Sequence, residues 1–168
     1  SGTLTLGDFT LGTVVGGTGT LSLSGDSKTL QFNPTSGPAM WWDADGVAPL
    51  GGSGAWDTSS ALWHSIASND AVIAWDNAAP SIKEAIFAGG AGTVNITAGA
   101  INFNLLTFRA DGFTITNGTL NLSGASPNRI SVSNGVNATI ASGITGTNSV
   151  GLNAPGGTLT LTGTNNFT

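Results

Sequence analysis

The 168-residue chain contains no cysteine and no tyrosine. Without cysteine it cannot form the disulfides that hold many small secreted domains together. A catalytic Cys–His pair is excluded for the same reason. Bacterial surface repeats fold without disulfides, so the missing cysteine does not place the chain in the cytosol.

Charged residues are also scarce, at 8% of the chain, and four Lys or Arg face nine Asp or Glu for a net charge of −5. A nucleic-acid partner requires a basic face whose binding releases counterions, so that class of function is excluded. The chain is nonetheless 39% hydrophobic. Disordered chains combine high net charge with few apolar residues, so this composition favours an ordered fold with a core.

Long hydrophobic runs are missing as well. No stretch approaches the roughly 18 apolar residues that span a bilayer. The opening SGTLTLGDFT lacks the basic region and apolar core of a signal peptide. We therefore expect no membrane span in these residues, and any export signal or anchor would lie outside them.

A five-residue phrase occurs four times: GTLTL at 2–6, GTLSL at 19–23, GTLNL at 118–122 and GTLTL at 157–161. Its leucines alternate with small polar residues, which indicates a strand with one buried face. Threonine suits such a strand because its branched side chain packs well on a pleated surface. Each copy is predicted to be one strand of a repeating coil.

Further alternating pairs follow the same rule, and Gly, Asn and Asp turn signals separate them. The apolar pairs are Val94 and Ile96, Phe113 and Ile115, Leu120 and Leu122, Ile130 and Val132, and Leu159 and Leu161. Many short strands indicate a sandwich, a barrel or a solenoid. We favour an all-β parallel β-helix, whose coils stack about 4.8 Å apart. An immunoglobulin-like sandwich is the alternative, but it does not call for one strand four times.

One segment could be helical. Residues 80–87, PSIKEAIF, have a capping box from Ser81 to Glu84 and apolar residues on one helical face. The competing interpretation is a further strand from Ala85, and the sequence leaves both open.

All five tryptophans lie between residues 41 and 75: Trp41, Trp42, Trp56, Trp63 and Trp75. Four of the nine acids lie in the same segment and a fifth directly follows it: Asp43, Asp45, Asp57, Asp70 and Asp76. The first interpretation is packing, because aromatic rings bury large areas and can close one end of a coil stack. The second is a glycan-binding platform, in which rings stack on sugars and Asp43, Asp45 or Asp57 accepts from hydroxyls. The third is an exposed patch for self-association.

No catalytic set is expected. Asp43 with Asp45 or Asp57 could flank a glycosidic bond, but these acids stand beside Gly and Ser, as solvated loop residues do. His64 is the single histidine, no serine sits in a G-x-S-x-G elbow, and His64 is interpreted as a loop or core residue. Asp43 and Asp45 resemble the start of a calcium loop, but Val47 occupies the third ligand position and the later Glu is missing, so no metal or cofactor is predicted. A loose calcium site at Asp43 and Asp45 is the alternative.

The tryptophan segment resembles a known family. WWDADGVAPLGGSGAWDTSSALW, then AIFAGGAGTVNI, LLTFRADGFTITNGTLNLSG and the closing GTLTLTGTNNFT are similar to the passenger-associated β-strand repeat of bacterial autotransporters. The resemblance covers 41–168 and implies a right-handed parallel β-helix, exported through an outer-membrane barrel, without a catalytic set. It suggests a single module over 1–168. Within it, 1–40 would end a preceding repeat, 41–90 would be a Trp- and Asp-rich insertion, and 91–168 would be regular coils.

The predicted function is thus a non-enzymatic structural or adhesive module, secreted or on the bacterial cell surface. Both termini read as strands without a polar cap, which predicts stacking on neighbouring repeats or on other copies. A host surface or surface glycan is the candidate ligand, with no nucleic-acid partner. One alternative is a subunit of an extracellular filament stacking end to end. The other is a carbohydrate-binding or carbohydrate-active β-helix.

Overall fold

We analysed a computed structural model, which describes residues 5–10, 18–23, 29–36, 39–45, 49–65, 71–78, 84–123 and 128–167. These residues form strands and turns, with one short 3₁₀ helix, η1 (Leu6–Asp8). None of them forms a helix long and apolar enough to cross a membrane.

The strands before and at the start of the coil stack are β1 (Thr18–Leu23), β2 (Leu30–Ser36), β3 (Ala39–Trp42), β4 (Gly54–Trp56), β5 (Ala61–His64) and β6 (Ile73–Ala74). The next six are β7 (Glu84–Phe87), β8 (Thr93–Ile96), β9 (Ala100–Phe103), β10 (Leu105–Phe108), β11 (Phe113–Thr116) and β12 (Thr119–Leu122). The last six are β13 (Asn128–Val132), β14 (Asn137–Ile140), β15 (Gly143–Gly146), β16 (Val150–Asn153), β17 (Thr158–Leu161) and β18 (Asn166–Phe167).

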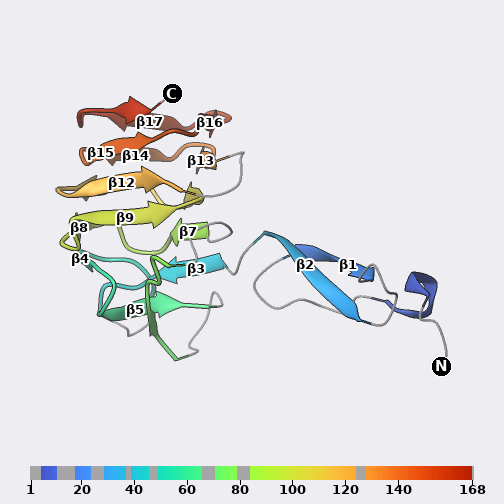
Figure 1. The fold of residues 1–168 in the computed structure, drawn as a ribbon. Coiled ribbons are helices and arrows are strands. Elements are labelled where there is room, and N and C mark those ends of the chain that lie inside the picture. The colour runs from blue at the N-terminus through green and yellow to red at the C-terminus, as the bar shows by residue number, and fades with distance from the viewer. Residues whose placement is uncertain are drawn as a thin grey trace.

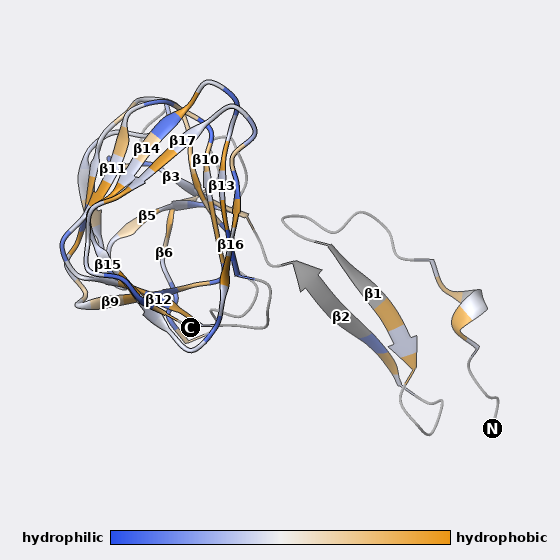
Figure 2. Ribbon diagram, turned by 90° about the horizontal axis from the view of Figure 1, so that it is seen from above, coloured by the Kyte–Doolittle hydropathy of each residue, from blue (hydrophilic) through white to orange (hydrophobic). Residues whose placement is uncertain are grey.

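The strands β3, β4 and β7 to β18 build a parallel β-solenoid of about four turns, as predicted. Each turn contributes one strand to each of three sheets, so β7, β8 and β9 form one coil and β10, β11 and β12 form the next (Figure 1). The sheet orders are β16-β13-β10-β7-β3-β5-β6, β17-β14-β11-β8-β4 and β18-β15-β12-β9. Seen from above, the coils superpose as a ring around a central core (Figure 2).

The alternation in the sequence sets which side chains enter the core. The side chains of Val94, Ile115, Leu120 and Ile130 are buried, and the residues that alternate with them in each strand face outward. Parallel register places like on like, so Val94 pairs with Ile115, which pairs with Ile140. Each coil therefore covers the apolar side chains of the coil below it.

The repeated phrase is only partly a coil strand. GTLNL at 118–122 overlaps β12 and GTLTL at 157–161 overlaps β17, but the two strands lie in different sheets. GTLSL at 19–23 lies in β1, which pairs antiparallel with β2, and this pair lies beside the stack (Figure 1). In the first copy Leu6 begins η1, and residues 2–4 lie outside the described part. The expectation of one strand type repeated four times is wrong, because alternation encodes a half-buried strand but not its partner.

The structure also decides between the two interpretations of residues 80–87. Glu84–Phe87 is β7, a strand paired with both β3 and β10. Residues 80–83 lie outside the described residues. Tertiary pairing on both edges outweighs a local helix preference in so short a segment.

One end of the stack departs from the parallel pattern. β5 pairs antiparallel with β3 and β6 pairs antiparallel with β5, next to the first coil. We call β5 and β6 the lid. At the opposite end β16, β17 and β18 are edge strands, where Leu152 is 61% exposed and Leu161 41% exposed.

Candidate functional site

The tryptophans gather in one aromatic cluster under the lid. Trp42, Trp56, Trp63 and Trp75 are each no more than 1% exposed. Their ring centroids lie 4.9 to 5.1 Å apart in edge-on and tilted contacts. Phe87 joins three of them and continues the cluster to Phe108 and Phe113 in the next coil. The faces of these four indoles cover one another, so as glycan platforms they are closed, and the packing interpretation accounts for them.

Two side chains that follow β6 in the chain, Trp75 and Asn77, cover the free edge of β9 with hydrogen bonds. Asn77 donates through Nδ2 to the Ala100 carbonyl at 2.8 Å and accepts from the Asn102 amide at 3.0 Å. Trp75 Nε1 donates to the Asn102 carbonyl at 3.1 Å. An open strand edge would offer these groups to another chain. Asn77 and Trp75 therefore act as a cap on this side of the stack.

Asp43 and His64 meet where β3 joins the lid. His64 Nε2 lies 3.0 Å from Asp43 Oδ2, and their exposed fractions are 4% and 0%. The expectation that Asp43 is a solvated loop acid is wrong, because pairing of β3 with β5 encloses its carboxylate. His64 is a core residue, one of the two alternatives that the sequence left open. A buried carboxylate requires such a partner.

The other two candidate acids stand apart from that pair. The Asp45 amide donates to Asp43 Oδ1 at 3.4 Å, and the Asp45 side chain is exposed. Asp57 caps the turn after β4 by accepting from the backbone amides of Ser60 at 2.5 Å and Ser59 at 2.8 Å. The Ser60 amide, opposed by partial burial and assisted by Ser59, holds the pKa of Asp57 below its usual value. Asp57 is thus committed to a turn.

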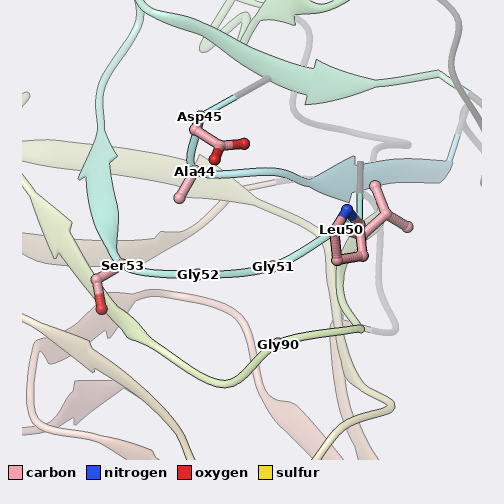
Figure 3. Close-up of a pocket in the computed structure, with 8 residues that line it drawn as sticks. Ala44, Asp45, Leu50, Gly51, Gly52, Ser53 and Gly90 are labelled. Carbon is pink, nitrogen blue, oxygen red and sulfur yellow. The ribbon is translucent and has the colours of Figure 1, made fainter. Parts of the chain in front are cut away.

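A shallow hollow of about 350 Å³ lies beside Asp45, and it is lined mainly by backbone: Ala44, Asp45, Pro49, Leu50, Gly51, Gly52, Ser53 and Gly90 (Figure 3). Gly51 and Gly90 form a parallel bridge there, and the Gly52 amide donates to the Gly90 carbonyl at 2.8 Å. Among the described residues no group of three or more His, Asp or Glu side chains could hold a metal ion.

The glycines of this region allow two backbones to interlock. A Cβ on Gly51 would lie 2.1 Å from the Gly90 carbonyl oxygen, and one on Gly92 would lie 2.2 Å from the Gly52 carbonyl. Gly51 also has φ +107°, a conformation that side chains rarely adopt. Gly51 lies in GGSG and Gly92 in FAGGAG, within the segments that carry the family resemblance, and their role is close packing of neighbouring coils.

Trp41 is the exception among the tryptophans. It is half-buried, on the outer face of the seven-stranded sheet, and Arg109 lies with its guanidinium carbon 4.7 Å from the ring centroid. Sequence reasoning missed Arg109 and Arg129, which are both exposed on that face. The signal was available for Arg129, since it alternates with the buried Ile130 in NRISV.

Comparison with known proteins gives one informative match. Over 155 residues, which cover 84% of this chain, the sequence is 43% identical to a curated protein named "Adhesin BmaC autotransporter" from Brucella suis biovar 1 (strain 1330). The chain spans only 4% of that protein's length. No family model matches the chain, and no solved structure matches it. The similarity and the parallel β-solenoid both fit an autotransporter passenger.

Proposed function

We propose that this chain is a non-catalytic, adhesive segment of a bacterial surface β-helix. The observation that carries the proposal is the uninterrupted stack of register-matched coils, joined to its similarity to a protein named as an autotransporter adhesin. Such a stack presents broad, regular outer faces, which suit contact with a surface.

The arrangement of the acids supports a function without catalysis. Asp43 is enclosed with His64, and Asp57 is held by Ser59 and Ser60. Glycoside cleavage requires two carboxyls facing one bond from opposite sides. Acids that are committed to a buried pair and to a turn are poorly suited to that role, which weighs against the carbohydrate-active alternative.

The test is retention of chain-coated beads under flow over epithelial monolayers and over glycan-coated glass. Beads coated with the folded chain should be retained on at least one of these surfaces, and albumin-coated beads should wash off. Equal loss of both kinds of bead on every surface would contradict adhesion. Release of reducing sugar from a polysaccharide panel would contradict the non-catalytic part.

A second candidate, association through the end of the stack, is favoured by the last coil. Leu152 pairs with the buried Ile130, and Leu161 pairs with the buried Ile140, yet both leucines are exposed. Exposed apolar side chains beside free strand edges favour pairing with a further coil.

A further inference from the structure

The outer face of the seven-stranded sheet carries both arginines of the chain. Arg129 lies in β13, Arg109 directly follows β10, and both are exposed. Within the described residues neither guanidinium forms an ion pair. The remaining cations, Lys28 and Lys83, lie outside those residues. In the described part of the chain, an acidic protein thus presents two guanidinium groups on one face without an ion-pair partner.

Strand register fixes how the two arginines are spaced. Arg129 pairs with Leu105, and Arg109 lies four residues beyond Leu105 along the same direction. At about 3.3 Å per residue and 4.8 Å between strands, their Cα atoms are roughly 14 Å apart. Thr107 and Ser131 are register partners between them, on the same outer face. We call Arg109, Thr107, Ser131 and Arg129 the arginine strip.

Trp41 gives the strip one fixed end. In register, Trp41 pairs with Ile86 and Ile86 with Thr107, so Arg109 must reach past β7 to lie over the ring of Trp41. Ile86 points to the outer face by alternation but is only 1% exposed, as expected beneath a side chain that crosses it. Cation–π contact holds the guanidinium in place and leaves its edge N–H groups to donate.

Among the described residues, Glu84 is the carboxylate in register with the strip. Glu84 pairs with Leu105 and accepts a hydrogen bond of 2.5 Å from Thr107 Oγ1. Two guanidinium groups against Glu84 leave the strip with a surplus of one positive charge, whereas the whole chain carries −5. Asp43 on β3 is enclosed with His64, and Asp111 lies in the turn after β10, where it accepts from Asn137. The strip therefore favours an anionic ligand where the rest of the molecule does not.

We propose that the arginine strip binds an acidic polysaccharide, with uronate carboxylates on Arg109 and Arg129 and sugar hydroxyls on Thr107 and Ser131. A guanidinium matches a carboxylate with two parallel N–H donors. A polymer with a carboxylate on each sugar can reach both arginines, whereas a small anion can reach only one. The inference rests on the adhesive function proposed above and names its ligand class.

The test is binding of polygalacturonate to the immobilised 168-residue chain, measured by biolayer interferometry at several salt concentrations. Fully methyl-esterified polygalacturonate is the matched ligand control, because it keeps the sugar chain and lacks the carboxylates. We expect binding of the acid form that weakens as salt rises, and little binding of the ester. Equal binding of both, or no binding of the acid form at low salt, would overturn the proposal.

Matched variants locate the site. R109Q and R129Q should each weaken binding roughly five- to tenfold, as loss of one charge-assisted hydrogen-bonding group does. K28Q removes the same charge from a position that precedes the stack in sequence, and it should bind as the parent does. E84Q should bind at least as tightly as the parent. Within the described residues Arg129 makes no cation–π contact, so R129Q separates a binding effect from a folding effect at Arg109.

Two results would replace the proposal with another explanation. Equal weakening in K28Q and R129Q would mean that binding follows net charge rather than the strip. Binding of poly-glutamate as tight as that of polygalacturonate would assign the strip to acidic protein segments. Beads retained on cells by a chain that ignores polygalacturonate would overturn this inference while leaving the adhesive function in place.

Discussion

At the scale of single residues, the tryptophan block works as a cap on the coil stack. Four indoles are enclosed and Trp41 alone is partly open on the outer face. Two of the enclosed rings also bond to backbone, since Trp42 Nε1 donates to the Gly52 carbonyl at 3.0 Å and Trp75 Nε1 to the Asn102 carbonyl. The residue type that suggested sugar binding thus mainly provides core.

This burial predicts the fluorescence of the chain. Iodide stays in water, so it should quench only a minor fraction of the emission, that of Trp41. The variant W41F should remove most of the quenchable fraction and leave the remaining emission intact. Quenching of most of the emission in the parent, measured as a Stern–Volmer plot, would mean that the cluster is open.

A second prediction at this scale concerns Gly92. A Cβ there would overlap the Gly52 backbone, and backbone cannot move aside as a flexible side chain can. We expect G92A to lower the free energy of unfolding by about 1–3 kcal/mol. The control is G151A, where the nearest atom to a new Cβ is 3.7 Å away and a change within about 0.5 kcal/mol is expected. Denaturant titration measures the free energy of unfolding of both variants. Equal stabilities would contradict the close backbone packing of Gly92 against Gly52.

At the scale of elements, asparagines connect successive coils in addition to the strand hydrogen bonds. Asn102 Nδ2 donates to the Asn77 carbonyl at 3.0 Å, and Asn102 Oδ1 accepts from Asn121 Nδ2 at 2.7 Å. Asn117 Nδ2 donates in the same way to Asn95 Oδ1 at 2.7 Å. Asn102 therefore links the cap to β9 and β9 to β12.

Removing Asn102 should weaken both links. We expect N102A to reduce the free energy of unfolding by about 1–2 kcal/mol, from two lost side-chain hydrogen bonds of modest net value each. Thr114→Ala changes an outward side chain that makes no hydrogen bond within the described residues, and it should cost less. Thermal unfolding followed by circular dichroism compares the stabilities of the two variants. A larger loss of stability in T114A than in N102A would contradict a stabilising role for the asparagine hydrogen bonds between coils.

The sequence predicted the elements better than their partners. Alternation at Val94 and Ile96 or Leu120 and Leu122 reports which side is buried, because the side-chain period of a strand is two. The alternation does not report which strand lies next to a given strand. For this reason nearly identical five-residue phrases occur in β1, β12 and β17, which have different partners. The sequence also contains no sign that Asp43 pairs with His64, because this contact depends on the antiparallel pairing of β3 with β5, which no local pattern encodes. The limits of the 1–40, 41–90 and 91–168 segments remain a prediction.

At the scale of the whole molecule, the two ends of the stack differ. The lid covers the aromatic cluster at one end and finishes in β6, an antiparallel edge strand on which Ile73 is 46% exposed, whereas β16, β17 and β18 are parallel edge strands at the other end. Continuous end-to-end growth requires both ends to offer matching edges. We therefore propose that this chain does not grow end to end as the filament alternative requires, because an antiparallel lid edge does not match a parallel coil edge, and that association through β16, β17 and β18 stops at a pair.

This asymmetry predicts limited association. Analytical ultracentrifugation over a range of concentrations should show monomers and, at the high end, dimers. The double variant L152K/L161K should stay monomeric, because charge at the open coil opposes its burial. Long regular fibres in negative-stain electron microscopy would contradict the proposal that the lid prevents end-to-end growth. They would favour the hypothesis that the chain is a filament subunit.

Parallel coils in register underlie the cap, the ladders and the arginine strip, and cysteine pairs test that register most directly. The chain has no cysteine of its own, so an introduced pair has no competitor. Thr93, Thr114 and Thr139 form one outward column on β8, β11 and β14. Register partners on adjacent strands lie about 4.8 Å apart, within the Cα range of a disulfide, and residues two coils apart do not.

Mild oxidation followed by mass spectrometry should find an internal disulfide in T93C/T114C and none in T93C/T139C. Equal cross-linking of the two pairs, or cross-linking of the second pair alone, would contradict the parallel coil stack.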